Sequence, residues 1–552
     1  MTPVFRDLRI IIVAVFALFT GAAGIWSLPP LDRDEARFAQ ATAQMLESGD
    51  FIAIRFQEDE RNKKPAGIHW LQAASVSALS AESERQIWAY RIPSLIGAVF
   101  AAVFTYLAAL RLYDARTALV AALLLASAPV VAAESTIAKT DGMLLGLVCL
   151  AQLAFIHIYA RAEESQRKTW RWPLLFWGAH GAAALIKGPI APMVSLLTGA
   201  GLFAAKRNMR WLQAMRPVSG FFILALITAP WVIAIGLATE GRFFTDAIGG
   251  DMLGKVGGAQ EGHYGPPGYH SVLLWLLFWP ASALIIPGLL VAWRERDDWR
   301  SRFLLAWIIP AWIVFEIAAT KLPHYTMPLY PALAILAARV ATGPGVKIQW
   351  AARVGAAVYI AVGLTAAGLL AALPVYFSAA PLQLACFAIA SLVALGTVLI
   401  GALFWRGRRY AGALSAAGLA ALYAWIVMTT VLPGLSSLAV SPRLSTALEI
   451  AGRHPLHDDA PPTALVGYNE PSAVFLLGTQ TALTNASHAA ALLNSGAAGA
   501  AIIEQRHEAA FQNALSGAGA LPLAVIDGLN YSNGDEVSLT IYVLRPPEPA
   551  EQ

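Results

Sequence analysis

Acidic and basic side chains gather in the segment that follows the first apolar run of the sequence. Asp34, Glu35 and Arg37 stand together there, and Lys64 follows within Lys63-Lys64-Pro65. Only 13% of all residues are charged and 57% are hydrophobic, so this concentration is unusual for the chain. Cations can hold a phosphate, and a carboxylate beside them can accept a proton or orient a hydroxyl. We therefore expect the chemistry of the protein in this segment.

Other polar candidates stand at the ends of apolar runs. Asp141 follows Thr140, Lys187 begins a tight Lys187-Gly188-Pro189 turn, and Lys321 and Tyr325 lie in Lys321-Leu322-Pro323-His324-Tyr325. Each has an ordinary structural explanation, because lysines at membrane edges contact lipid headgroups and an acid at a helix start interacts with the helix dipole. If these residues all lie on the same side of the membrane, a common functional site becomes the better explanation.

The composition is that of a polytopic membrane protein. The mean hydropathy is +0.57, and the chain contains 17 Trp and 23 Phe. Its net charge of +4 is dispersed among short loops, which argues against a nucleic-acid partner. Cys149 and Cys386 lie in apolar stretches and offer neither a disulfide framework nor a Cys-based zinc site. The first run, 10–28, is expected to be a retained helix, because Pro29-Pro30 and a charged loop follow it without a small-residue cleavage site.

The hydrophobic pattern predicts a mainly α fold, a membrane bundle of about thirteen helices. A span needs about 20 apolar residues. The predicted ranges are 10–28, 88–110, 117–133, 140–160, 172–186, 189–205, 217–238, 271–292, 303–319, 325–341, 354–376, 382–404 and 410–432. The segment 68–79 is too short to span and is expected to be interfacial or re-entrant.

Loop charges orient this bundle. Alternate connections are rich in arginine and lysine, and the positive-inside rule places them, with the amino terminus, in the cytoplasm. These cations are Arg111, Arg116, Arg161, Arg167, Lys168, Arg171, Lys206, Arg207, Arg210, Arg216, Arg294, Arg296, Arg300, Arg302, Arg406, Arg408 and Arg409. The loop 29–87, the loop 239–270, the 321–325 turn and the chain after Leu432 then face outward. The carboxy-terminal part is therefore expected outside the cytoplasm.

Two domains are predicted. Residues 1–435 form the membrane domain, and residues 441–552 form a small α/β domain outside the membrane. Its expected strands are the apolar runs 463–466, 500–503, 523–526 and 537–544, with a hairpin turn at Asn533-Gly534. No Gly-rich phosphate loop or nucleophile elbow is visible in it, so we assign it no chemistry.

A helix is predicted within the first outer loop. Asp32 and Glu35 fit a capping box at its start, and Gly49 fits its end. Capping does not require Asp34. Asp34 and Arg37 stand three residues apart and can share one face of this helix, so Asp34 is the better candidate for function.

These motifs resemble those of the GT-C glycosyltransferases, in the branch of the aminoarabinose transferases and protein O-mannosyltransferases. The resemblance covers about the first 340 residues. It is carried by 31–38, by Lys63-Lys64-Pro65 running into Trp70-Leu71-Gln72, and by Thr140-Asp141, Lys187-Gly188-Pro189 and 321–328. It implies a polytopic enzyme that moves a sugar from a polyprenyl-phosphate donor to an acceptor, which is lipid A or another lipid, a glycan or a protein. It also implies a bacterial inner membrane, with the reaction at the outer face of that membrane and the carboxy-terminal domain in the periplasm.

The resemblance also implies roles for individual residues. Asp34 matches the catalytic carboxylate and Asp141 a second active-site acid. The residues expected to bind the lipid phosphate are Arg37, Lys64, Lys187, Lys321, Tyr325 and His69. Cations at the departing phosphate would stabilise the charge that develops there. Asp34 would deprotonate an attacking hydroxyl, which predicts a single displacement with inversion; an acceptor phosphate would need Asp34 only for positioning.

The sequence departs from the family pattern at two positions, one associated with a metal and one with a hydroxyl group. The family often has a Glu associated with a bound metal where this chain has Lys63, and a Tyr where it has Phe38. The His-bearing segment 261–270 offers Glu261, His263 and His270, which could bind a divalent metal such as zinc. No cofactor is otherwise implied.

A different class of function is a transporter or flippase of lipid-linked sugars. Ionisable residues at mid-membrane depth and two repeated halves would support this function. Glu316 is one of few such residues, and no internal repeat is visible. A membrane protease or oxidoreductase is not supported, because the sequence shows neither a His-Glu-x-x-His helix nor paired haem histidines within its spans. The sugar and the acceptor stay open.

Overall fold

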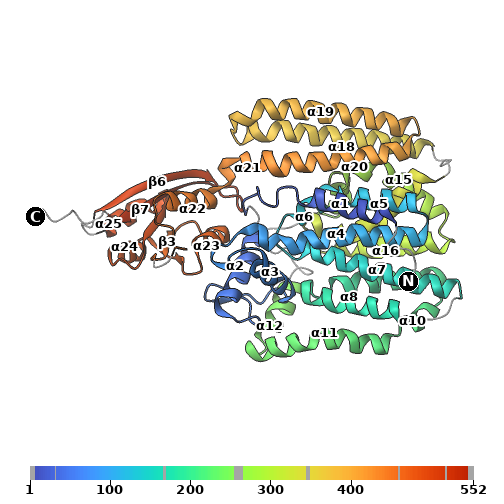
Figure 1. Cartoon of the computed structure of the whole chain (residues 1–552), viewed down its shortest axis with the longest axis horizontal. Coiled ribbons are helices and arrows are strands. Elements are labelled where there is room, and N and C mark those ends of the chain that lie inside the picture. Colours follow the sequence, from blue (N-terminus) through green and yellow to red (C-terminus); the bar gives the residue numbers. More distant parts are fainter. Residues whose placement is uncertain are drawn as a thin grey trace, which may run out of the picture.

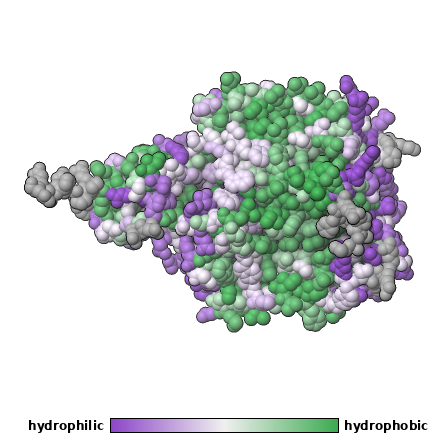
Figure 2. Space-filling model, in the orientation of Figure 1, coloured by the Kyte–Doolittle hydropathy of each residue, from purple (hydrophilic) through white to green (hydrophobic). Residues whose placement is uncertain are grey.

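The structure is a computed structural model that describes residues 7–30, 33–165, 169–253, 265–343, 349–457, 460–515 and 519–544. Long helices run side by side in a bundle, and a small domain with a β-sheet lies at one end of it (Figure 1). Hydrophobic residues cover the flank of the bundle, and hydrophilic residues gather at the end away from the small domain (Figure 2). This distribution is that of a multi-pass membrane protein.

Each of the thirteen predicted ranges overlaps a helix. These helices are α1 (Leu8–Gly21), α4 (Ile87–Leu112), α5 (Ala115–Ala126) with α6 (Pro129–Ser135), α7 (Asp141–Glu163), α8 (Arg171–Lys187), α9 (Ile190–Lys206), α11 (Pro217–Ala238), α14 (Tyr269–Leu277) with α15 (Ser282–Arg294), α16 (Trp299–Ile317), α17 (Tyr330–Thr342), α18 (Gln349–Tyr376), α19 (Ala380–Trp405) and α20 (Arg409–Ile426).

Fewer than thirteen helices in the described part of the chain are long and apolar enough to cross a membrane by themselves. Within the described residues six helices meet this requirement, or eight if each of two bent pairs counts as one span. The pairs bend by 62° between α5 and α6 and by 87° between α14 and α15. Pro129 begins α6, and Pro280 lies in the 3-10 turn Trp279–Ala281 that precedes α15, so proline accounts for both breaks. The prediction of thirteen spans stays a prediction.

Close glycine packing joins α4 to α7. A Cβ atom on Gly97 would lie 2.3 Å from the carbonyl oxygen of Gly142, and one on Gly142 would lie 2.6 Å from that of Ser94. Small residues let membrane helices approach until their backbones touch. Gly142 directly follows Asp141, so this packing determines where the Asp141 carboxylate stands.

The first loop folds into short elements against the end of the bundle. They are α2 (Arg33–Ser48), the two-residue strands β1 (Arg55–Phe56) and β2 (Asp59–Glu60), and α3 (Gly67–Leu79). The predicted end of α2 is confirmed, because Gly49 follows it in the left-handed region with φ of +72°. The prediction of a short, non-spanning helix over 68–79 is confirmed by α3.

Shorter helical pieces complete the bundle. They are the 3-10 helix η2 (Glu82–Glu84), α10 (Arg210–Met215), α12 (Arg242–Phe244), the π-helix η3 (Thr245–Leu253), the 3-10 helix η5 (Pro323–Leu329), the π-helix η6 (Val427–Val431), α21 (Leu432–Gly434) and the 3-10 helix η7 (Ser436–Leu438).

The carboxy-terminal domain has a mixed five-stranded sheet. Its elements are α22 (Val440–Ile450), β3 (Thr463–Val466), α23 (Pro471–Leu477), β4 (Ala482–Leu483), α24 (Ala486–Asn494), β5 (Ala500–Glu504), the 3-10 helix η8 (Gln505–His507), α25 (Glu508–Ala514), β6 (Ala520–Leu529) and β7 (Glu536–Leu544). The strand order is β4-β3-β5-β7-β6, with β3 parallel to β4 and β5 and the other pairs antiparallel. The predicted strands and the turn at Asn533-Gly534 are confirmed.

We predict that Gly97→Val lowers the melting temperature of the purified protein by several degrees. The new side chain meets the Gly142 backbone, which cannot move aside as a flexible side chain can, and overpacking of this kind costs about 1–3 kcal/mol. Gly418→Val in α20 is the matched control, because a Cβ there meets nothing within 4 Å. Thermal unfolding in detergent measures both, and equal melting temperatures would contradict the packing argument.

Candidate functional site

Charged side chains from separate segments converge where α2 meets the ends of α6, α7 and α8. One group surrounds Asp34 and a second surrounds Asp141. The two are electrostatically connected, because the charge of Lys139 acts on both Asp34 and Asp141. We call these residues, Asp34, Arg37, Arg61, Glu134, Lys139, Asp141, Lys187 and His324, the charged site.

Asp34 lies between two guanidinium groups. Its Oδ1 is 3.5 Å from an Arg37 nitrogen, one turn along α2, and 3.9 Å from an Arg61 nitrogen that follows β2. Burial raises the pKa of Asp34, but the positive charges of Arg61, Arg37 and Lys139 outweigh it and hold this pKa below its usual value. The side chain is still 49% exposed, so an ionised carboxylate is open to an incoming molecule.

Asp141 forms a close ion pair with Lys187. Lys187 Nζ lies 2.5 Å from Asp141 Oδ1, and the two side chains are only 15% and 7% exposed. Lys187 is the last residue of α8, and Gly188 turns the chain there with φ of +63°. The Tyr325 ring centroid is 5.7 Å from the same ammonium, in a cation–π contact. Three residues predicted from separate motifs are thereby brought together.

His324, Glu134 and Lys139 extend this pair inward, and we did not single them out from the sequence. His324 Nε2 is 3.6 Å from Asp141 Oδ1, and its Nδ1 is 3.3 Å from Glu134 Oε1. Lys139 Nζ is 3.1 Å from the same Glu134 oxygen. Burial lowers the pKa of His324 to about 3, so its ring is neutral. The sequence feature that could have indicated this cluster is Glu134, an acidic residue within an apolar run.

Glu35, next to Asp34, has a structural role, because it joins α2 to α4. It forms a two-pronged ion pair with Arg91 of α4, at 2.8 and 2.9 Å, and both side chains are 1–2% exposed. The amide of Ala138 donates to the same carboxylate at 2.8 Å. This pair joins the start of α2 to α4 and to the segment that carries Lys139. Asp32, the other member of the predicted capping box, lies outside the described residues.

The Lys63-Lys64-Pro65 element lies beside the end of α8. A Cβ on Gly67 would be 2.6 Å from the Leu185 carbonyl oxygen, so the start of α3 touches the turn that presents Lys187. Lys64 is half-buried in this element and Lys63 is exposed. Their part in binding phosphate stays a prediction.

His69 is enclosed between α2 and α3. It is fully buried, its Nδ1 is 2.8 Å from Thr42 Oγ1, and its ring stacks on Phe38. Burial lowers the pKa of His69 to about 3, which makes the ring neutral. The imidazole packs α3 against α2, and its predicted part in binding phosphate stays a prediction. The Phe38 ring also contacts the Arg61 guanidinium, which lies 4.6 Å from the ring centre.

Lys321 binds backbone oxygens, and the predicted metal site is described only in part. Lys321 Nζ donates to the carbonyl oxygens of Gly265 and Ala318, each at 2.7 Å, and so ties down the segment before α14. His270 is buried in α14. Glu261 and His263 lie outside the described residues. Among the residues that are described, no group of three or more His, Cys, Asp or Glu is placed to hold a metal.

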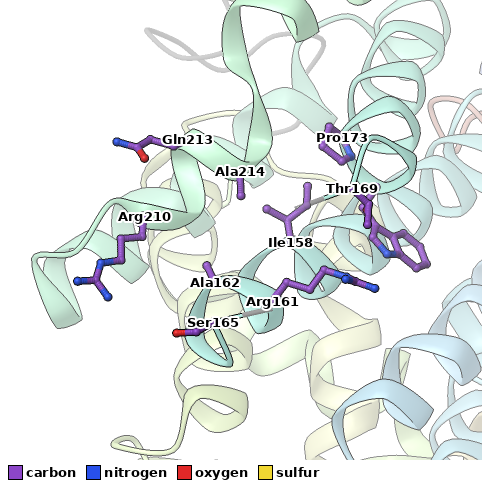
Figure 3. Close-up of a pocket in the computed structure, with 10 residues that line it drawn as sticks. Ile158, Arg161, Ala162, Ser165, Thr169, Pro173, Arg210, Gln213 and Ala214 are labelled. Atoms are coloured by element: carbon purple, nitrogen blue, oxygen red, sulfur yellow. The ribbon is translucent and has the colours of Figure 1, made fainter. Parts of the chain in front are cut away.

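A separate pocket lies at the opposite end of the bundle, between α7, α8 and α10 (Figure 3). Its volume is about 310 Å³. The lining residues are Ile158, Arg161, Ala162, Ser165, Thr169, Trp172, Pro173, Arg210, Gln213 and Ala214. It shares no residue with the charged site.

Sequence comparisons match the first part of the chain. Residues 63–233 match a family model described as dolichyl-phosphate-mannose-protein mannosyltransferase. The undecaprenyl phosphate-alpha-4-amino-4-deoxy-L-arabinose arabinosyl transferase of Pseudomonas aeruginosa is 29% identical over 328 residues, 57% of each chain. The protein of the same description from Erwinia tasmaniensis is 28% identical over 381 residues, 67% of this chain and 66% of that one. The match thus spans less than two thirds of these relatives.

Solved structures extend the similarity over nearly the whole chain. ArnT from Cupriavidus metallidurans bound to undecaprenyl phosphate aligns with a TM-score of 0.73 and 19% identity, covering 98% of both chains. The oligosaccharyltransferase of Archaeoglobus fulgidus aligns with a TM-score of 0.51 and 14% identity, covering 91% of this chain and 70% of that one. The fold, including the small domain, is therefore that of ArnT.

We predict that the neighbouring acids Asp34 and Glu35 affect stability very differently. Glu35→Gln leaves Arg91 buried without its counter-charge, which costs about 3–5 kcal/mol, and should lower the melting temperature markedly. Asp34→Asn changes a half-exposed side chain and should leave the melting temperature within about one degree of the parent. Thermal unfolding in detergent measures both variants. A larger loss for Asp34→Asn would contradict this assignment.

Proposed function

We propose that this chain, a GT-C glycosyltransferase in its fold and in the motifs of its first 340 residues, moves a sugar from an undecaprenyl-phosphate donor to an acceptor at the membrane surface. The observation that carries the proposal is the charged site. It places the ionised Asp34 carboxylate beside guanidinium groups and near the Asp141–Lys187 pair. Transfer of a sugar from a phosphate needs this combination of charges.

The cations of the site fit a departing lipid phosphate. Breaking the bond between the anomeric carbon and the phosphate builds negative charge on the phosphate oxygens. Arg37 and Lys187 reach the site from α2 and α8. Lys64 precedes α3, whose start touches the end of α8, and we propose that it also binds the phosphate. Arg61 joins them although it was not predicted. The donor class is supported by the relatives, whose names specify an undecaprenyl-phosphate-linked sugar.

Asp34 fits the acceptor side of the reaction. A carboxylate with a lowered pKa is ionised at neutral pH and can orient or deprotonate a hydroxyl that attacks the sugar. Direct attack of the acceptor predicts inversion at the anomeric carbon. If the acceptor is a phosphate, it is already ionised, and Asp34 positions it.

Asp141 positions the cation on the donor side. Its carboxylate holds the Lys187 ammonium at 2.5 Å, and His324 and Glu134 lie behind it. A preorganised ammonium needs no rearrangement when charge develops on the phosphate. Tyr325 covers the same ammonium with its ring.

The names of the relatives favour a particular sugar. They describe transferases of 4-amino-4-deoxy-L-arabinose. We therefore propose aminoarabinose as the first sugar to test. The names do not specify an acceptor, and we propose lipid A, one of the acceptors that the motif resemblance implies, as the first acceptor to test. The proposed orientation places the charged site and the small domain in the periplasm and the arginine-rich end in the cytoplasm of a bacterial inner membrane.

A transporter or flippase is the weaker hypothesis. Glu316 was the main intramembrane acid in its favour. Its carboxylate instead accepts hydrogen bonds from the amides of Gly268 and Ser271, at 3.0 and 2.9 Å, and so binds the start of α14. In liposomes, a transporter would move labelled lipid across the bilayer unaltered, whereas a transferase would consume the donor.

We predict that Asp34→Asn lowers transfer from an undecaprenyl-phosphate sugar by about 100-fold or more, because the amide cannot take a proton from an acceptor hydroxyl and lacks the charge with which Asp34 would position an acceptor. The measurement is product formation in membranes with matched protein levels. Asp59→Asn is the control, since Asp59 is an exposed acid of the same loop. Equal rates for Asp34→Asn and Asp59→Asn would contradict the role of Asp34.

We predict a shift in pH dependence for Arg61→Gln. In the parent, the lowered pKa of Asp34 keeps the carboxylate ionised, so activity falls only when the pH drops below the usual range for an aspartate. Removing Arg61 removes a charge that lowers this pKa, so the acidic decline of kcat/KM should move to higher pH. Arg55→Gln, at an exposed arginine of the same loop, should leave the profile unchanged. Superimposable profiles for Arg61→Gln and the parent would contradict the prediction.

A further inference from the structure

A buried arginine joins the first loop to the carboxy-terminal domain. Arg85 precedes α4, and its side chain is 3% exposed. One guanidinium nitrogen donates to Gln40 Oε1 at 2.8 Å and to the Phe475 carbonyl oxygen at 2.9 Å. The other donates to Thr479 Oγ1 at 2.8 Å and to the Glu47 carboxylate. Gln40 and Glu47 belong to α2, whereas Phe475 and Thr479 belong to the small domain.

Thr479 is the point where these bonds meet. Its hydroxyl accepts from Gln40 Nε2 at 2.8 Å and donates to Glu47 Oε2 at 2.7 Å. Gln57, beyond β1, donates to the carbonyl oxygens of Thr479 and Thr481 at 3.1 and 2.6 Å. We call Gln40, Glu47, Arg85 and Thr479 the junction network.

Apolar and charged contacts reinforce the same junction. The Phe475 ring packs edge-on against Tyr90 of α4, with centroids 5.3 Å apart. At the start of α2, Arg33 Nε is 4.0 Å from Glu470, a buried acid that also accepts from Ser532 at 2.8 Å. The small domain therefore contacts α2 at its start and along its length, where the domain meets the bundle (Figure 1).

The same helix carries the centre of the proposed reaction. Asp34 and Arg37 lie in the first turns of α2, and Gln40 lies less than two turns beyond Asp34. Glu35 holds one side of this helix to α4, and the junction network holds another side to the small domain. A helix held in this way cannot rotate or slide without breaking buried polar bonds, which are expensive to leave unpaired.

We propose that the carboxy-terminal domain positions α2 for sugar transfer, and that Arg85 and Thr479 are the positioning residues. This proposal rests on the proposed function. Neither residue need touch the substrates. They act through the placement of Asp34 and Arg37, and a displacement of about 1 Å can lower a rate by about 100-fold. The domain without recognisable chemistry of its own would then be required for the reaction.

The test is Thr479→Val in the full-length protein, which removes the hydroxyl while keeping the shape of the side chain. We expect kcat to fall about 10-fold with the KM for the undecaprenyl-phosphate donor within about twofold of the parent. Asp34 and Arg37 are displaced with α2, whereas Lys64 and Lys187, the other proposed phosphate cations, lie outside α2 and still bind the donor. Thr479→Ser restores the hydroxyl and should recover kcat. Thr446→Val is the control, since Thr446 bonds only to Pro442 of its own helix among the described contacts.

A second variant approaches the network from α2. Gln40→Met removes the amide that bonds to Arg85 and Thr479 and leaves the carboxy-terminal domain unaltered in sequence. Its loss of kcat should match that of Thr479→Val, and the double variant should lose little more than either single one. Additive losses, or unchanged kcat in both single variants, would overturn the proposal.

Amide hydrogen exchange separates this proposal from the proposed function. Thr479→Val and Gln40→Met should speed exchange over residues 33–48, whereas Thr446→Val should not. If the parent transfers no sugar but exchange in α2 responds as expected, the proposed function fails and the coupling of domain to helix stands. If the parent is active and exchange in α2 is unchanged, the coupling is overturned.

Discussion

The buried ion pair between Glu35 and Arg91 is the interaction on which the charged site depends. A guanidinium enclosed by α2 and α4 must have both a counter-charge and hydrogen-bond acceptors, and it finds them in Glu35 and in the carbonyl oxygens of Ile25, Leu28 and Pro29. These partners come from two segments, α2 and the stretch 25–29 that follows α1, so one side chain determines how the chain passes from the first helix into α2. The direction of Asp34, one residue earlier, follows from that constraint.

The site itself combines opposite charges at different depths. Asp34 is half exposed, with two guanidinium groups around it, whereas Asp141 and Lys187 are almost enclosed. An enclosed pair is held rigidly, so the fold sets the position of its ammonium before any charge develops nearby. A half-exposed carboxylate can meet a second substrate from water. One side of the site thus suits a lipid phosphate that arrives through the membrane, and the other suits an acceptor that arrives from the surface.

The small domain contacts the helix that carries Asp34 without placing a residue of its own in the charged site. Its strands and helices form a core of their own, but α23 and the turn after it place polar atoms against α2 and Arg85. Burying Arg85 at the junction requires every partner to stay in place. Relative motion of domain and bundle is therefore opposed by desolvated charge, in addition to apolar packing.

The sequence by itself determined the membrane character, a helix in each of the thirteen apolar ranges and four of the five strands of the small domain. It also identified Asp34, Arg37, Asp141 and Lys187 as the candidates that the structure brings together in the charged site. Hydrophobic runs and turn signals are local, so they could be interpreted residue by residue. Tertiary structure alone decided that His69 packs against Phe38, that Lys321 bonds to backbone carbonyls, and that Glu134, Lys139 and His324 stand behind Asp141. It also decided that Arg85 meets Thr479 across nearly 400 residues of chain. These partners come close together only when the helices pack, so no local sequence pattern predicts them.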